Sequence, residues 1–335
     1  MTDLKHQYVV FKGVEGFADR LQCLLQVIAY SKATSRTLVV DWRDADWQHD
    51  PSADLSDFFV LEGVNCLAIH EFLTRISGER TPLSVYPEAW SERIDTPDFR
   101  DFCREDQYKL PDNSKSIQAI CDGDRCDFEA DVVVYVGIGE RTYEYKLAKH
   151  LMLACAIKQR IEEFASRLSL YEQTYDVVHL RGGSKAWMGG FVADSSPVKD
   201  QHQKWVDVDA YLSPIWDVYQ YLLSLNPGDR PLFLLSDHPL MIEAWKERYN
   251  CGVAIDNSVP GVLSESGIHK LAPGDLARIG SGLTKAELNY ECIRDFVVMM
   301  NSRVLVGDGV SLFSLMAFQL KTADVRWCRF PSWSF

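Results

Sequence analysis

The sequence has little that would hold this chain in a membrane or direct it out of the cell. No apolar run approaches the roughly 20 residues of a membrane-spanning helix, and residues 1–8 contain no apolar core of a signal peptide. Positive charge is also scarce, because 35 Lys and Arg residues stand against 48 Asp and Glu residues and give a net charge of −13. This balance argues against nucleic acid or an anionic membrane as the main partner.

Paired cysteines are missing as well. The nine cysteines are an odd number, scattered singly along the chain, and several lie in apolar runs as free core thiols do. Cys121 and Cys126 form one close pair, and without a second pair they do not indicate a zinc site. We therefore expect a protein of the reducing cytoplasm.

The first half of the sequence shows the pattern of an α/β protein. Residues 7–11 read as a strand, a glycine loop follows, and helical spacing of apolar residues then predicts a helix over 19–32. A second strand is predicted over 37–42, so the unit implies a parallel sheet. Gly13 and Gly16 would let a ligand approach the helix N-terminus, which favours an anion, although this stretch taken alone fits a plain strand-to-helix turn better.

The chain is long enough for two domains. A helix predicted over 146–168 closes the first, and we expect the boundary near residue 170, which gives domains at 1–170 and 171–335. The second half repeats the α/β pattern, and Thr284 with Glu287 forms a capping box that marks one helix start. The predicted elements are strands at 177–180, 231–237, 253–256 and 303–306, and helices at 208–225, 239–249, 284–301 and 311–321.

Cationic side chains leave the end of the strand at 177–180 together. Arg181 and Lys185 flank the pair Gly182 and Gly183, and His179 lies within the strand. Arginine offers a planar fork to a phosphate and lysine a point charge, so the turn suits a diphosphate. The alternative is a tight turn in which Arg181 pairs with one of the many carboxylates of the chain.

Polar residues also follow the neighbouring strands. The strand at 231–237 ends in the polar pair Ser236 and Asp237, and Ser311 and Ser314 come after the strand at 303–306. Ligands of parallel sheets sit beyond the carboxyl ends of the strands, so these groups would open toward one crevice. Asp295 lies in the apolar stripe of the helix that begins at Thr284, where a carboxylate needs a partner. That partner is either a backbone amide or arginine, or a ligand donor such as a guanine edge.

These residues together resemble the fucosyltransferase superfamily that includes the rhizobial nodulation fucosyltransferase and the core α1,6-fucosyltransferases. Residues 179–185 look like its His-x-Arg-Arg-Thr-Asp-Lys block, and residues 235–239 are similar to its strand-end Ser/Thr-Asp-Asp-Pro block. Asp295 followed by residues 310–317 resembles its last block, a helix Asp and a Ser-rich turn. Residues 16–22 look like its first glycine loop.

The resemblance implies a GT-B fold, in which two Rossmann-like domains face a central cleft. It implies that domain 1–170 binds the acceptor and domain 171–335 binds a GDP-sugar, most often GDP-fucose, for transfer with inversion and without a metal. Carried over by position, the donor-site residues have distinct roles: Arg181 and Lys185 hold and stabilise the leaving diphosphate, His179 and Asp295 address the guanine, Asp237 lies by the nucleoside, Ser311 lies by the phosphates, and Gly16 belongs to the first glycine loop.

The sequence departs from the family pattern at the catalytic base. Gly189 stands where family members have a glutamate, so the base is absent or comes from elsewhere, and Asp194, Glu15 and Glu140 are candidates. We expect transfer of fucose to a glycan or lipooligosaccharide, with membrane contact only through such an acceptor. A nucleotide-sugar binding module without transfer activity, and the same fold with a different donor sugar or nucleotide, are the alternatives.

Overall fold

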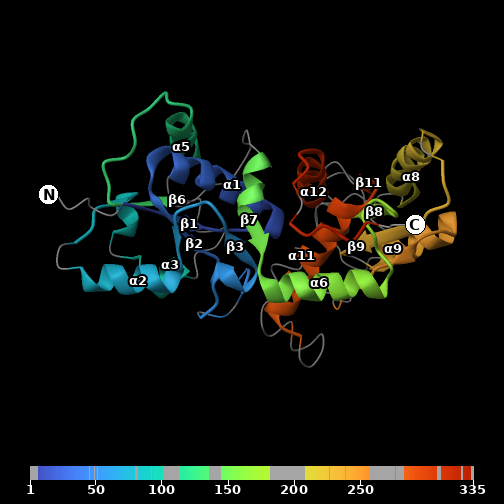
Figure 1. Ribbon diagram of the computed structural model, residues 1–335, viewed down its shortest axis with the longest axis horizontal. Coiled ribbons are helices and arrows are strands. Elements are labelled where there is room, and N and C mark those ends of the chain that lie inside the picture. Colours follow the sequence, from blue (N-terminus) through green and yellow to red (C-terminus); the bar gives the residue numbers. More distant parts are fainter. Residues whose placement is uncertain are drawn as a thin grey trace, which may run out of the picture. The chain divides into compact units, whose positions relative to one another are not determined.

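The computed structural model describes residues 7–44, 46–48, 50, 52–79, 82–91, 93–94, 96–100, 113–135, 145–181, 208–225, 227–237, 239–256, 258, 276, 283–307, 311–325 and 327–332. Contacts divide the chain into two compact units, Met1–Ile157 and Lys158–Phe335, and each has its own parallel sheet (Figure 1). This boundary falls within helix α6 (Cys155–Arg167), before the predicted position near residue 170. The physical reason is that α6 packs on the second unit, where Arg160 lies 3.6 Å from the ring centre of Tyr290.

The first unit is built on a five-stranded sheet in the order β4-β2-β1-β6-β5, with every pairing parallel. Its β1 (Tyr8–Lys12), α1 (Phe17–Thr34) and β2 (Thr37–Asp41) are the strand, helix and strand that the sequence predicts. All five residues of β1 are buried, as expected for a central strand that is covered on both faces. The other elements of this unit are η1 (Leu55–Asp57), β3 (Phe59–Leu61), β4 (Cys66–Leu67), α2 (Ile69–Gly78), β5 (Val85–Tyr86), η2 (Glu88–Trp90), α3 (Pro97–Arg100), α5 (Ser114–Cys121), β6 (Val132–Tyr135), η3 (Tyr145–His150) and β7 (Leu151–Leu153).

The single helix predicted over 146–168 is wrong in its first part. The structure has the short 3₁₀ helix η3, then β7, and only then α6. Strand β7 pairs antiparallel with β3, with Leu151 opposite Leu61 and Leu153 opposite Phe59. Leu151 and Leu153 are buried and Met152 between them is exposed, which is the period of two that a strand requires.

The second unit is built on a four-stranded parallel sheet in the order β10-β9-β8-β11. Thr284 caps α11 as predicted, since its hydroxyl accepts a hydrogen bond from the Glu287 amide at 3.2 Å. Besides α6, the elements are β8 (Asp176–Leu180), α8 (Val208–Leu225), β9 (Leu232–Ser236), α9 (Pro239–Tyr249), β10 (Val253–Ala254), α11 (Lys285–Asn301), β11 (Val304–Gly307) and α12 (Leu312–Thr322).

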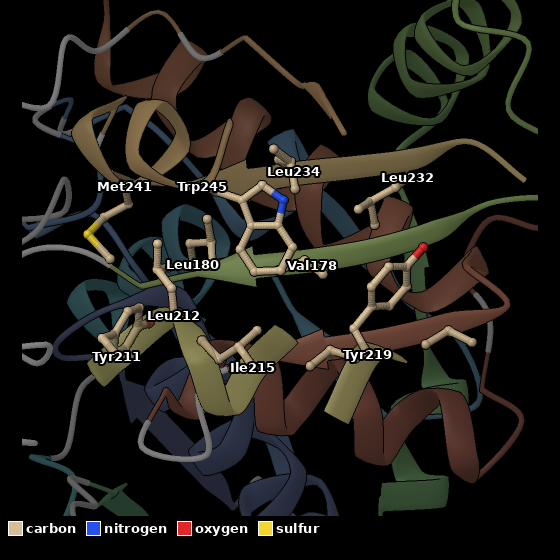
Figure 2. Close-up of a cluster of buried hydrophobic side chains, with 12 residues drawn as sticks. Val178, Leu180, Tyr211, Leu212, Ile215, Tyr219, Leu232, Leu234, Met241 and Trp245 are labelled. Carbon is tan, nitrogen blue, oxygen red and sulfur yellow. The ribbon is translucent and has the colours of Figure 1, made fainter. Parts of the chain in front are cut away.

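Helices α8 and α9 cover one face of this sheet with a dense apolar cluster. Figure 2 shows Trp245 of α9, which is fully buried, next to Val178 and Leu180 of β8 and Ile215 of α8. Because side chains alternate along a strand, Val178 and Leu180 point into this cluster and His179 points to the opposite face. The packing of one face therefore fixes the direction of the functional side chain on the other.

Candidate functional site

The carboxyl ends of neighbouring strands bring several predicted site residues of the second unit together. Strand β8 lies between β9 and β11, and all three run parallel. Arg181 follows the end of β8, Asp237 follows the end of β9, and the two form an ion pair through Arg181 Nη1 and Asp237 Oδ2. Their side chains are 18% and 11% exposed, so the pair is shielded but still reachable from solvent. The predicted crevice residues of these two strands thus meet, and Arg181 has the carboxylate partner that the alternative interpretation expected.

The backbone of Arg181 is held by a residue that the sequence analysis missed. The Tyr211 hydroxyl on α8 accepts a hydrogen bond from the Arg181 amide at 3.0 Å and donates one to the Arg181 carbonyl at 3.2 Å. Tyr211 is almost fully buried, so its hydroxyl is confined to this position. In the sequence Tyr211 is one more aromatic residue of an apolar helix, and nothing marks it as a partner of the strand end.

His179 lies on the face of the sheet opposite to the α8 and α9 cluster. Its Nδ1 is 2.7 Å from the Ser314 hydroxyl on α12, and its ring contacts Phe313. Burial lowers the pKa of His179 to about 4, and Asp237, which raises this pKa, compensates only in part. The imidazole is therefore neutral at physiological pH, with one nitrogen engaged by Ser314.

The contact between His179 and Ser314 depends on Gly307. Gly307 pairs with His179 across the β8–β11 register. A Cβ at Gly307 would lie 2.7 Å from Ser314 Oγ and 2.8 Å from Ser314 Cβ, which is closer than van der Waals contact allows. The absence of a side chain at Gly307 lets the start of α12 approach the strand.

Ser311 occupies the N-cap position of α12 and is 2% exposed. Its side chain makes no capping hydrogen bond to the helix. A helix N-terminus presents amide groups and a partial positive charge that suit a phosphate. This position agrees with the phosphate role that the resemblance implies for Ser311, which stays a prediction.

Asp295 is buried in α11, as the apolar stripe predicts, and is 7% exposed. Its Oδ1 accepts hydrogen bonds from Arg294 Nε at 2.9 Å and Arg294 Nη2 at 2.7 Å. Burial and Asp295 raise the pKa of the Cys292 thiol, one turn earlier in α11, while Arg181 acts to lower it. Cys292 is thus within electrostatic reach of both Asp295 and Arg181.

The glycine loop of the first unit is shaped by buried charges. Arg20 donates a two-pronged pair of bonds to Asp44, at 2.8 and 2.6 Å, and its Nε donates to the Glu15 carbonyl at 2.8 Å. Glu15 has a left-handed backbone with φ of 64°, which is uncommon for a residue with a side chain. Gly16 is half-buried at the N-cap of α1. The arrangement fixes the loop but does not itself test the predicted donor role of Gly16.

Gly13 supports the packing of this loop. A Cβ at Gly13 would lie 2.5 Å from the Trp42 ring and 2.7 Å from Arg20. Beside it, Lys12 at the end of β1 forms a fully buried ion pair with Asp41 at 2.9 Å. Burial raises the pKa of Asp41, but Lys12 and Arg43 outweigh this effect and lower it to about 2. The packing function of Gly13 favours the plain-turn interpretation for that glycine.

Several residues of the sequence-based hypothesis lie outside the described residues, among them Gly182 and Gly183 of the predicted turn and four positions with predicted roles. These four are Lys185, Gly189, Asp194 and Glu140. Their predicted roles therefore stay predictions. Within the described ranges, no group of three or more His, Cys, Asp or Glu side chains is arranged to hold a metal ion. Of the helices in those ranges, none combines the length and apolar composition needed to cross a membrane.

A comparison with family models decides the relationship of the chain. Residues 5–264 match the model for Nodulation protein Z (NodZ). The chain belongs to the NodZ family. Two curated relatives agree: Nodulation protein Z of Sinorhizobium fredii is 24% identical over 258 residues, 73% of this chain and 72% of that protein. The Bradyrhizobium diazoefficiens protein of the same name is 24% identical over 257 residues, 71% of this chain and 61% of that protein.

Solved structures give the fold of this NodZ-family chain. A NodZ alpha-1,6-fucosyltransferase soaked with GDP-fucose matches with a TM-score of 0.62 and 16% identity, covering 93% of this chain and 92% of that one. POFUT1 in complex with GDP-fucose matches with a TM-score of 0.53 and 14% identity, covering 99% and 98%. The predicted GT-B fold and membership of the fucosyltransferase superfamily, a group of glycosyltransferases, are confirmed.

Proposed function

We propose that this protein transfers fucose from GDP-fucose to a hydroxyl group of a glycan or lipooligosaccharide, with inversion at the anomeric carbon and without a metal ion. The observation that carries the proposal is the ion pair of Arg181 and Asp237 at the carboxyl ends of β8 and β9, next to the buried neutral His179. Two of the similar solved structures support it: one is a NodZ alpha-1,6-fucosyltransferase soaked with GDP-fucose, and the other is POFUT1 in complex with GDP-fucose.

In the proposed reaction, cationic side chains stabilise the leaving group, which is the diphosphate of GDP. As the bond between C1 of the sugar and the phosphate oxygen breaks, the electron pair moves to the diphosphate, and Arg181 with Lys185 stabilises that charge. Asp237 limits where the Arg181 guanidinium can lie, and Tyr211 fixes its backbone. The acceptor oxygen attacks C1 from the opposite face and gives its proton to a carboxylate base.

The base needs its own experiment because Gly189 replaces the family glutamate. We expect that one of Glu15→Gln, Glu140→Gln and Asp194→Asn lowers kcat by about 100-fold or more, the usual size of general-base catalysis. The measurement is GDP release at saturating GDP-fucose and acceptor. If all three variants keep wild-type kcat, the base is not among them, and proton transfer to the departing phosphate becomes the better model.

The missing glutamate also favours one alternative, a module that binds the nucleotide sugar without transferring it. The test combines a thermal-shift series of GDP, UDP, ADP and CMP with turnover of GDP-fucose in the presence and absence of neutral oligosaccharides. The proposed function predicts the largest stabilisation with GDP and release of GDP with time. Stabilisation by GDP without any release would support the binding module, and equal stabilisation by all nucleotides would contradict a guanine-specific donor site.

A further inference from the structure

Arg294 is the neighbour of Asp295 in helix α11 and binds its buried carboxylate. Its guanidinium donates two hydrogen bonds to a single oxygen, Asp295 Oδ1, at 2.9 and 2.7 Å. Hydrogen bonds of this charged type are shorter and stronger than neutral ones. Two bonds from a rigid planar fork to one oxygen restrict rotation of the carboxylate, so Arg294 sets the plane in which Asp295 can meet a ligand.

Several contacts hold the Arg294 side chain in place. Its side chain is 5% exposed, and its guanidinium lies 4.6 Å from the ring centre of Phe164 on α6. Nη2 also donates to the Asp256 carbonyl after β10 at 3.4 Å. The charge of Glu291, one turn earlier in α11, favours the charged form of Arg294. Contacts with three separate segments of the second unit therefore hold this guanidinium in one place.

Arg294 also borders an open cavity of about 850 Å³ within the second unit. Residues of α6 and α11 line it, among them Arg160, Phe164, Glu287 and Tyr290. The α6 residues Arg160 and Glu163 are exposed, whereas the Arg294 side of the wall is buried. The Arg294 side chain therefore lies at the buried wall of a cavity whose other wall is open to solvent.

From these contacts we infer that Arg294 is a positioning residue that orients Asp295 for guanine and thereby sets the nucleotide specificity of the donor site. Guanine presents an N1–H and an exocyclic 2-amino group side by side, and a carboxylate accepts both only when its plane is aligned with the base. Adenine offers an acceptor at N1 and no 2-amino group. The inference rests on the proposed function, because it takes Asp295 to be the group that meets the guanine.

The experiment measures Kd by calorimetry for GDP, IDP and ADP, where IDP lacks only the 2-amino group. A bidentate contact to a base discriminates by about 5- to 150-fold, so wild type should prefer GDP over IDP within that range. Arg294→Ala should reduce this preference to about 3-fold or less, since the misaligned carboxylate forfeits most of that bidentate discrimination. Arg294→Lys should fall between the two because it keeps the charge without the fork.

Arg303→Ala is the matched control. Arg303 also forms a buried two-pronged pair with an aspartate of the same unit, Asp176, at 3.0 and 2.8 Å. Asp176 begins β8, so this pair lies at the amino end of the strand, away from the predicted ligand edge. Its removal should lower stability and leave the GDP to IDP ratio unchanged. An equal loss of selectivity in Arg303→Ala would overturn the inference, because the effect would then come from general loosening.

Chemical rescue separates orientation from folding. Arg294→Ala leaves a space of guanidinium size beside the cavity, so millimolar methylguanidinium should restore part of the GDP preference, and should not do so in Arg303→Ala. In the transferase reaction, Arg294 variants should raise KM for GDP-fucose and change kcat little, because the guanine ring is remote from the reacting carbon of the sugar. A lower kcat with unchanged KM would contradict a role of Arg294 in positioning the guanine.

The outcomes distinguish the two proposals. If wild type binds ADP as tightly as GDP, the guanine donor itself is wrong. If wild type selects GDP but both Arg294 variants keep the same ratios, the donor assignment stands and the role of Arg294 is refuted. Should Arg294→Ala fail to fold, Arg294→Lys still decides the point, because an unchanged GDP to IDP ratio in that variant refutes alignment by the fork.

Discussion

The buried imidazole of His179 makes the stability of the protein depend on pH in a way that can be tested. Its pKa is lowered to about 4 by burial, whereas an unfolded histidine has a pKa near 6.5. The unfolded chain therefore binds a proton at His179 below about pH 6.5 while the folded protein does not. Stability from this residue is fully present at higher pH and is lost as pH falls below the unfolded value. The loss continues down to about pH 4 and stops there, when the folded state also takes up the proton.

The size of the effect follows from the two pKa values. The full difference corresponds to about 3 kcal/mol, and between pH 7.5 and 5.5 the linkage relation gives about 1.3 kcal/mol. This upper window is useful because most carboxylates are ionised in both states and do not contribute. We expect His179→Gln to remove this contribution, so that the stability difference between wild type and variant changes by that amount over the window.

Two measurements check the value for His179. Urea unfolding at each pH gives the stability difference, and an NMR titration of the imidazole resonances, assigned by their loss in His179→Gln, gives the pKa directly. Ser314→Ala is a useful companion, because it removes the partner of Nδ1 and leaves the ring buried, so the pKa should remain low. A resonance that titrates near pH 6.5 and disappears in His179→Gln would refute the neutral, buried imidazole.

Three further predictions concern binding, catalysis and packing. Arg181→Ala should lower kcat/KM by an amount that corresponds to a loss of about 2 kcal/mol or more of transition-state stabilisation. Activity within about twofold of wild type would remove Arg181 from the site. Asp295→Asn should weaken GDP binding by about 1–3 kcal/mol and favour ADP relative to GDP in calorimetry, because one acceptor becomes a mismatched donor; an unchanged ratio would contradict the guanine contact. Gly307→Ala should destabilise the fold by about 1–3 kcal/mol through its clash with Ser314, whereas Gly228→Ala, with its nearest neighbour at 3.7 Å, should be nearly neutral in urea unfolding.

Much of the fold was predictable where local signals agree. The helix at 208–225 has the predicted bounds, and the α11 start follows from its cap at Thr284. Strand β7 was not predictable in the same way, because three residues acquire strand structure only by pairing with β3, which lies about 90 residues earlier. The contact-based division at Ile157 and Lys158 lies before the predicted boundary for a similar reason, since most of α6 packs in the second unit through contacts that have no trace in its own periodicity.

The site shows the same division between local pattern and tertiary partner. The strand ends and the apolar stripe were enough to select Arg181 and Asp295, and both lie where those patterns predict. Two other contacts were not predictable: Tyr211 meets the Arg181 backbone from a helix that begins 27 residues later, and the hydroxyl of Ser314 reaches His179 only because Gly307 has no side chain. Sequence alone therefore identifies the charged groups, whereas the residues that orient them depend on how the helices dock on the sheet.

The proposed function requires this acidic chain to accept an anionic donor, and the pairing of its charges bears on how it could do so. Asp237 and Asp295 would each repel a diphosphate if they stood alone. Each is instead paired with an arginine, Arg181 and Arg294, so the carboxylates act through geometry more than through net charge. His179, which is within electrostatic reach of Arg181 and Asp237, stays neutral and adds no competing charge. Under the two proposals, a nucleotide would meet a site in which Arg181 is held at the strand ends for the phosphates and Arg294 orients the Asp295 carboxylate for the guanine.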